Sequence, residues 1–242
     1  MKMKVLKSFL VLFLFSTLAW GQWTYSITAT PWFFFCMPGD TECTLDIAPI
    51  LPGSYVAVLE SSHSVAIHGR DDIIYVTDNG SDLFFVDPKC QAWDRVMSRN
   101  AECAYTTVPS EGGATQVTVT RQTGGYSWDF AVIVFKSASG QVSLDSIGAA
   151  TNPKGSLTQF GVPLTLSGTD IVFQLIDMGA GVDSMSPVPP YNAVFEDHDC
   201  FGVAITNQGA APSCTSVKQL TSASCGLAFR EGANTALPRE LQ

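Results

Sequence analysis

The sequence predicts an all-β protein with a layered sandwich or barrel architecture, and two observations carry this prediction. Short β-branched and aromatic runs recur between Gly, Pro, Asn or Asp turn signals at roughly 8- to 12-residue spacing, and helical periodicity is almost absent. The longest apolar run outside the N-terminal leader, residues 126–136, is apolar on both alternating faces over its second half. A strand covered on both faces is typical of the centre of a two-layer β protein.

Strands are expected wherever Thr, Val, Ile and aromatic residues cluster. In chain order these runs are 22–35, 55–60, 64–68, 73–77, 83–86, 103–107, 115–121, 126–136, 142–144, 163–166, 171–176, 191–195, 200–206, 216–220 and 225–229. Asn79-Gly80 predicts a tight hairpin between 73–77 and 83–86, because a type I′ turn needs positive φ at both central residues. Residues 91–100 are the one stretch in which a helix is expected.

The first 21 residues have the features of a secretory signal peptide. Three lysines precede a short apolar core at 9–15, and cleavage fits after the small residues Ala19 or Gly21. This core is shorter than the ~20 residues of a membrane span. We therefore expect a secreted or extracellular protein, with the periplasm or cell surface as alternative locations. Its single disulfide-bonded domain is expected at 22–230, followed by a flexible tail at 231–242.

The chain without its leader is strongly acidic. Its remaining 10 Lys and Arg stand against 22 Asp and Glu, which gives a net charge of −12. Such a surface repels nucleic acid and anionic membranes, so neither is expected as a partner. Solubility alone explains the acidity, and neutral glycans or Ca²⁺ are compatible with it.

Seven cysteines predict three disulfides and one free thiol. About 105 arrangements exist, so the sequence leaves the pairing open. Proximity suggests Cys36–Cys43 and Cys90–Cys103, with a third bridge drawn from Cys200, Cys214 and Cys225. No Cys-x-x-Cys pair supports a zinc ribbon or a thioredoxin-like redox site.

Two common enzyme signatures are missing. The glycine-rich stretch at 179–184 lacks the third glycine of a dinucleotide fingerprint, and the prolines at 187–190 disfavour the helix that should follow. No Gly-x-Ser-x-Gly pentapeptide is present, which argues against an α/β-hydrolase. No catalytic residue is therefore assigned.

Five residues are candidates for binding. Asp197 and Asp199 are two residues apart, so on a strand they face the same side and could hold Ca²⁺ or act as a carboxylate pair. A solvated loop beside a disulfide explains them more simply. Trp32 and Trp93 could stack on sugar rings, although aromatic residues in a large β protein more often lie in the core. Asp129 becomes a candidate if it points into a concave face. No cofactor other than Ca²⁺ is expected.

Four short features follow one another in a familiar order: Val-Thr-Asp-Asn-Gly-Ser-Asp at 76–82, Cys-Ala-Tyr at 103–105, a Gly-Gly turn before 115–120, and the run 128–136. This order, over residues 54–205, resembles a type of uncharacterised secreted bacterial β-sandwich. The seven cysteines and the early glycine at position 80 depart from that type. The type is similar to concanavalin-like jelly rolls. The resemblance implies a two-layer antiparallel jelly-roll sandwich that binds glycans or attaches to a surface.

We therefore expect a non-enzymatic extracellular binding or surface-structural protein, with a glycan as the favoured ligand. A polysaccharide-degrading enzyme that uses a carboxylate pair is one alternative, and a purely structural subunit is another. A carboxylate pair at hydrolytic separation beside a groove with exposed rings would favour the enzyme. An unpaired sheet edge or an exposed apolar patch would favour the structural subunit.

Overall fold

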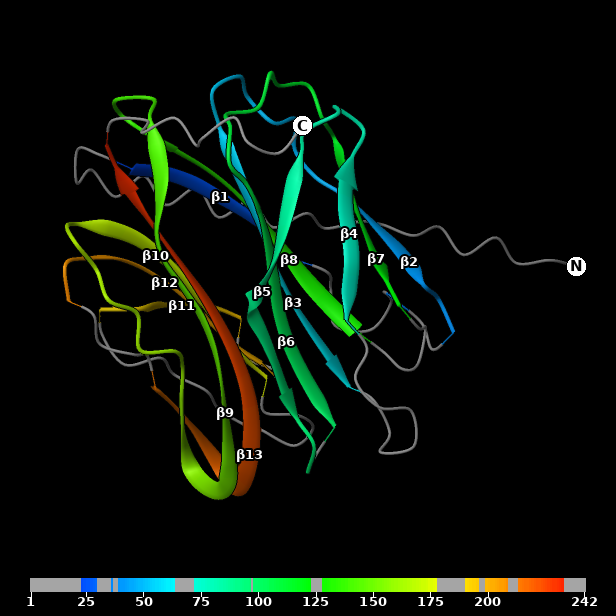
Figure 1. Cartoon of the computed structure of the whole chain (residues 1–242), viewed down its shortest axis with the longest axis vertical. Helices are drawn as coiled ribbons and strands as arrows, with labels where there is room; N and C mark the ends of the chain where they lie inside the picture. The colour runs from blue at the N-terminus through cyan, green and yellow to red at the C-terminus, as the bar shows by residue number, and fades with distance from the viewer. Residues whose placement is uncertain are drawn as a thin grey trace, which may run out of the picture.

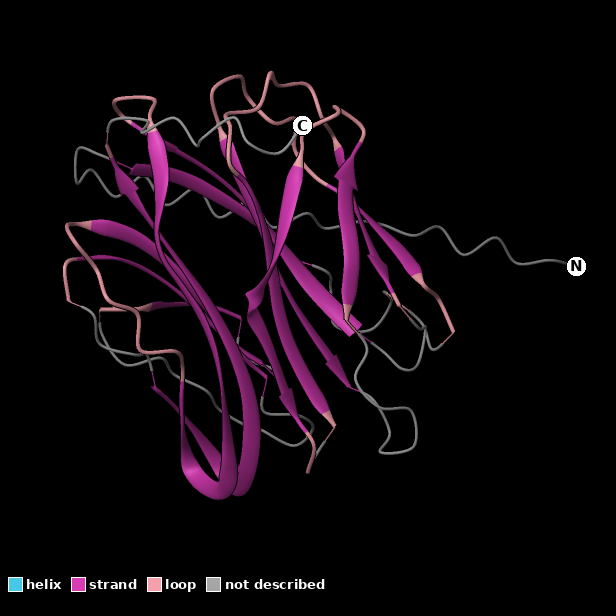
Figure 2. Cartoon of the chain, viewed as in Figure 1, coloured by secondary structure: helices cyan, strands magenta, loops and turns pink. Residues whose placement is uncertain are grey.

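The computed structural model describes residues 23–29, 36, 39–63, 72–96, 98–122, 128–177, 190–195, 199–208 and 213–232. Within these ranges every regular element is a β-strand (Figure 2), which confirms the all-β prediction. The strands are β1 (Trp23–Ala29), β2 (Glu42–Asp46), β3 (Tyr55–His63), β4 (Ile73–Asp78), β5 (Phe84–Asp94), β6 (Arg99–Thr106), β7 (Gln116–Arg121), β8 (Trp128–Ser137), β9 (Val142–Phe160), β10 (Asp170–Asp177), β11 (Asn192–Phe195), β12 (Asp199–Thr206) and β13 (Ser213–Glu231). This described part holds no helix of the length and apolarity that a membrane span requires.

The strands form three antiparallel sheets. Sheet A has the order β1-β8-β3-β6-β5, sheet B the order β2-β7-β4, and sheet C the order β11-β12-β10-β13-β9. Sheet A lies between the other two, with sheet C on one side and sheet B on the other (Figure 1). The chain alternates between sheets A and B from β1 to β5, adds β6 to sheet A, and passes through β7 of sheet B before β8. It then builds sheet C from one continuous segment, 142–231.

Strand β8 shows why three layers form. Phe130 and Val132 face the core shared with sheet B, whereas Ile133 and Phe135 face the core shared with sheet C. The central position predicted for 126–136 is confirmed, since β8 is hydrogen-bonded to both β1 and β3. The two-layer prediction is wrong, because a strand that is apolar on both faces needs cover on both.

The core between sheets A and C is centred on Phe135. Its ring centroid lies 5.2 Å from that of Phe173 and 4.7 Å from that of Phe229, both on sheet C. Tyr55 and Trp23 pack against the same ring from neighbouring strands at 6.0 and 6.3 Å. One aromatic side chain of β8 therefore joins the two large sheets.

The Asn79-Gly80 hairpin prediction is wrong. Strand β4 belongs to sheet B and β5 to sheet A, so the turn between them changes sheets. The Asn79 side chain explains the difference, because its Oδ1 accepts hydrogen bonds from Thr115 N at 2.8 Å and Gln116 N at 3.1 Å. The positive φ of this turn falls on Ser81, at 72°, and not on Asn79 and Gly80 as a type I′ turn needs.

The helix expected at 91–100 is also wrong. Residues 91–94 end β5 and residues 99–100 begin β6, with a tight turn that includes Ser98 at φ 54° between them. The two strands pair from Gln91↔Glu102 to Asp94↔Arg99. The disulfide between Cys90 and Cys103 ties them together next to this register.

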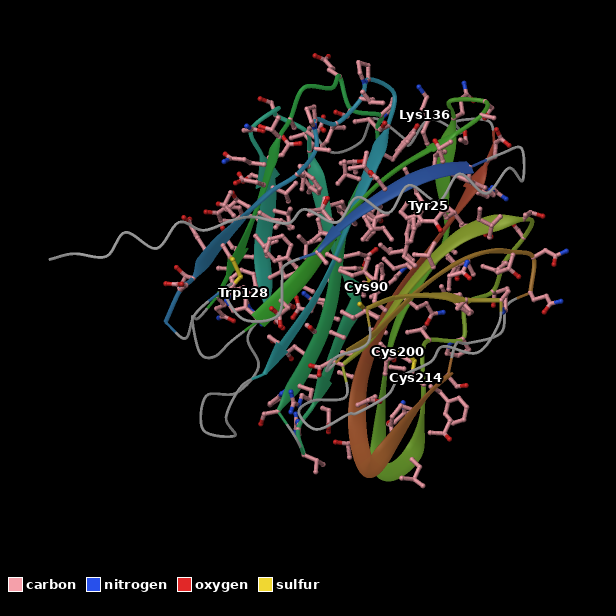
Figure 3. All side chains as sticks on the ribbon, turned by 180° about the vertical axis from the view of Figure 1, so that it is seen from behind. Tyr25, Cys90, Trp128, Lys136, Cys200 and Cys214 are labelled. Carbon is pink, nitrogen blue, oxygen red and sulfur yellow. A yellow bond between two sulfur atoms is a disulfide. The ribbon has the colours of Figure 1, made fainter. Side chains whose placement is uncertain are left out.

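The disulfide predictions are confirmed. The bridges are Cys36–Cys43, Cys90–Cys103 and Cys200–Cys214, and the seventh cysteine, Cys225, is buried outside any disulfide, with its Sγ 3.2 Å from Glu102 O. Figure 3 labels Cys90, Cys200 and Cys214, and marks the two ends of β8 with Trp128 and Lys136. The predicted leader, 1–21, and the tail beyond Gly232 lie outside the described residues.

Phe135→Ala should lower the free energy of unfolding by about 3–5 kcal/mol, because it opens a cavity among packed rings. Phe85→Ala is the matched control, since this ring on edge strand β5 is 50% exposed and its loss should cost much less. Equilibrium unfolding in denaturant measures both changes. Equal losses in the two variants would contradict the central role of Phe135.

Candidate functional site

The structure separates the residues predicted as a binding site. Trp32 and Asp197 lie outside the described residues, and Asp199 is the first residue of β12, where it pairs with Asp177. Trp93 and Asp129 are both half-buried in sheet A. Alternation along their strands places Trp93 on the face toward sheet B and Asp129 on the face toward sheet C. The structure therefore does not bring Trp93 and Asp129 together.

A carboxylate pair that the sequence reasoning missed lies between sheets A and B. Glu60 on β3 and Glu102 on β6 are directly opposite each other in the antiparallel ladder. Side chains in this relation have Cβ atoms about 4.5–5.5 Å apart. Glu60 is 0% and Glu102 1% exposed. One feature of the sequence indicates this site: Glu60 continues the alternation of Val56 and Val58, so it lies on the same buried face of its strand.

Arg121 of sheet B neutralises one member of this pair. Its Nη1 forms an ion pair with Glu60 Oε1, and both side chains are fully buried. The Arg121 guanidinium also lies 5.5 Å from the centroid of the Trp128 ring. Buried charges of this kind persist only when they are paired, so the ion pair joins sheet A to sheet B.

Glu102 is held differently. Its Oε2 accepts a hydrogen bond from Ile73 N at 2.8 Å and lies 3.4 Å from the donor Gln91 Nε2. Burial is the main cause that raises the pKa of Glu102 to about 8; Asp72 acts in the same direction, and the Ile73 N–H and Arg121 oppose it. Glu102 is therefore protonated at neutral pH, opposite Glu60, which is ion-paired with Arg121.

A neutral carboxylic acid facing an ionised carboxylate is the combination that glycoside hydrolysis uses. Their burial, however, keeps Glu60 and Glu102 from contacting a polymer. In this arrangement the pair links the two sheets and completes the polar end of their shared core. The two carboxyl groups are of the types that a hydrolase uses, but both are buried away from any polysaccharide.

A second polar cluster closes one end of the core between sheets A and C. Arg99 Nη1 lies 3.7 Å from Asp177 Oδ1, and Thr221 donates a hydrogen bond to Asp94. The predicted Asp199 begins its strand next to this cluster, as the ladder partner of Asp177. In the described ranges no group of three or more His, Cys, Asp or Glu could hold a metal ion, and Ca²⁺ at Asp197 and Asp199 stays a prediction.

Trp93 is the one predicted aromatic residue that the described ranges include. The Arg95 guanidinium lies 5.2 Å from its ring centroid. Its indole Nε1 donates no hydrogen bond to a described residue. The Trp93 ring is half-buried and its Nε1 is enclosed, so what this place can offer a ligand is part of the ring face and the Arg95 donors.

The fold and its clusters define a disulfide-bonded, three-sheet β protein with paired charges in its interior. Comparison of the chain with protein-family models, with curated proteins and with solved structures finds no match. The function is therefore inferred from the residues of this chain alone.

The free energy of unfolding should fall as the pH rises from about 4.5 to about 8, because folded Glu102 keeps a proton that the unfolded chain has lost. This component approaches about 1.4 kcal/mol per pH unit. Glu102→Gln should remove it, since a neutral amide has the same shape as the protonated acid. Denaturant unfolding between pH 4 and 9 measures the effect.

The control is Glu111→Gln, which changes an exposed glutamate and should keep the wild-type pH profile. An unaltered profile in Glu102→Gln would show that Glu102 is ionised in the folded protein.

Proposed function

We propose that this protein is a non-enzymatic extracellular binding or surface-structural protein, with a glycan as the favoured ligand. The burial of the Glu60–Glu102 pair carries this proposal. With exposures of 0% and 1%, these side chains serve as internal cross-links and do not reach a polysaccharide. Binding is then a task for the surface of the sheets and loops.

We further propose that β1–β8 form a jelly roll, against which sheet C packs as an additional layer. The pairs β1–β8, β2–β7 and β3–β6 support this proposal, since they are nested as in a ribbon of antiparallel strands folded over on itself. The fourth nested pair, β4–β5, is replaced, because β5 is hydrogen-bonded to β6 at the edge of sheet A. This topology fits the concanavalin-like resemblance of the sequence.

Secretion is part of the same proposal. Three disulfides suit an oxidising compartment, and the N-terminal segment has the composition of a signal peptide. A net charge of −12 without the leader argues against nucleic acid and anionic membranes as partners.

Trp93 is the proposed contact for a sugar ring. It is half-buried near the end of β5, and the exposed Arg95 beside it can donate hydrogen bonds to hydroxyl or carboxylate groups of a glycan. Aromatic stacking and a charged donor at one place are the features that orient a carbohydrate.

A glycan array probed with the mature protein tests this proposal. We expect binding that Trp93→Ala reduces at least tenfold, because the stacking surface is lost. Phe85→Ala, which removes an exposed ring from the same strand, should leave binding unchanged. Loss of binding in EDTA would instead locate the ligand at a Ca²⁺ site such as Asp197 and Asp199. No binding to any glycan would remove this ligand class.

A polysaccharide-degrading enzyme is the second candidate, and the ladder position of Glu60 opposite Glu102 is the observation that favours it. Release of reducing sugars from a panel of polysaccharides tests it. We expect no hydrolysis. Hydrolysis that is lost in both Glu60→Gln and Glu102→Gln, in variants that remain folded, would establish the enzyme and overturn the binding proposal.

A further inference from the structure

A short segment crosses the outer face of sheet C, the face that points away from sheet A. We name residues 161–169 the strap. Val162 and Leu164 are buried and Leu166 half-buried, whereas the residues between them are exposed. The inward side chains of the strap pack in one cluster with outward-facing residues of sheet C, namely Val172, Ala204 and Ala228. The strap therefore covers an apolar strip.

One end of the strap is tied by an uncharged residue. Val162 N donates to Gln174 Oε1 at 2.7 Å, and Gln174 Nε2 donates to Val162 O at 2.8 Å. Gln174 Nε2 also lies 3.5 Å from the hydroxyl of Tyr191. An amide does not titrate in the physiological range, so this end of the strap is held at every pH.

The other end is tied by a carboxylate. Ser167 N and Ser167 Oγ each donate to a different oxygen of Asp145, both at 2.6 Å. Arg230 Nη1 donates to Ser167 Oγ at 2.8 Å and lies 3.5 Å from Asp145 Oδ1. The hold on Ser167 therefore depends on an ionised Asp145, which is the better acceptor.

A second carboxyl group lies beneath this end of the strap. Asp170 is 0% exposed, and neither of its oxygens receives a hydrogen bond from a described residue. The charged groups that face it among the described residues are Asp145 of β9 and Arg230 of β13. Thr206 of β12 and Gly168 of the strap also lie next to Asp170, and both are uncharged.

A buried carboxyl beside a carboxylate is stable when it keeps its proton and donates it to that neighbour. Burial is the largest cause that raises the pKa of Asp170 to about 7, and the neighbouring Asp145 is the second. Burial alone would also raise the pKa of Asp145, but the hydrogen bonds from Ser167 lower it below its ordinary value. The two carboxyl groups thus hold one proton between them at mildly acidic pH.

We propose that the Asp145–Asp170 pair is a proton-controlled latch for the strap, which holds Ser167 on sheet C while the pair keeps its proton and frees Ser167 when the proton is lost. Loss of the proton places two negative charges together, and moving the strap outward lets water reach both. Because Gln174 still holds Val162, the strap swings about that end. The movement uncovers the apolar strip of Val172, Ala204 and Ala228.

The direction of the pH dependence follows from the raised pKa of Asp170. In the open state Asp170 is solvated and ionises near its ordinary value of 3.8. The closed strap is thus favoured below that pH, and opening increases by up to tenfold per pH unit until about pH 7. Above this pH both states are ionised and opening no longer changes.

Amide hydrogen exchange on the full chain between pH 5 and 8 tests the latch. Rates are expressed as protection factors, which remove the intrinsic dependence of exchange on pH. The protection factor of the Ser167 amide should fall by up to tenfold per pH unit between pH 5 and 7. The Val162 amide and the amides of β10 should keep theirs.

Three variants separate the latch from other effects. Asp170→Asn keeps a donor and cannot ionise, so the Ser167 amide should stay protected at every pH. Asp145→Asn loses the carboxylate and should expose that amide at every pH. Glu102→Gln alters another carboxyl of raised pKa, between sheets A and B, and should leave the Ser167 profile unchanged.

Four results would overturn the latch. They are a flat Ser167 profile in the wild-type chain, a wild-type profile in Asp170→Asn, loss of the profile in Glu102→Gln, and parallel loss of protection at Val162 and throughout β10. The last result would mean global unfolding. Should Asp170→Asn fail to fold, carboxyl ¹³C titration of the wild-type chain decides, and a pKa of Asp170 near 4 would sink the proposal.

Discussion

The structure depends on a middle sheet that is apolar on both faces. Sheet B has three strands and little capacity to bury a core alone, and sheet C has to cover one face of its own. Both sheets bury their apolar faces against sheet A. Phe130 and Val132 of sheet A pack against sheet B, and Ile133 and Phe135 pack against sheet C. At roughly 25 cal/mol per Å² of buried apolar surface, this two-sided burial is the main source of stability.

Charged residues complete the cores where the apolar layers end. Arg121 and Glu60 do so between sheets A and B, and Arg99 and Asp177 between sheets A and C. Such pairs add little net stability over apolar side chains. Removal of one partner, however, leaves a buried charge without its counter-charge and costs about 3–5 kcal/mol. Loss of either partner is therefore expected to destabilise the contact between the two sheets.

Local features of the fold were predictable from the sequence. The two-faced alternation of 126–136 predicts a central strand, and short sequence separation correctly pairs Cys36 with Cys43 and Cys90 with Cys103. The Asn79-Gly80 turn was misread because the Asn79 side chain bonds to Thr115 and Gln116, far along the chain. Local propensity depends on neighbouring residues and does not include a partner so distant in sequence.

The candidate site could not be predicted for a related reason. Glu60 and Glu102 meet only through the register of β3 against β6, and Arg121 joins them from a different sheet. Each looks like an ordinary polar residue in its own segment. A shift of register by one residue would turn either glutamate to the opposite face. Trp93, in contrast, is visible in the sequence as an aromatic residue in the segment between Cys90 and Cys103.

The nested order of the first eight strands has a consequence for how the chain reaches its fold. Trp23 at the start of β1 pairs with Ser137 at the end of β8, so sheet A closes only after its last strand is available. Contacts so distant in sequence make assembly slow, and they leave strand edges open to other chains meanwhile. Sheet C is made from one continuous segment, and its longest pairing, Val142 with Glu231, spans less of the sequence than Trp23 with Ser137. A chain that emerges from its N-terminus thus presents the slowest part of its fold first.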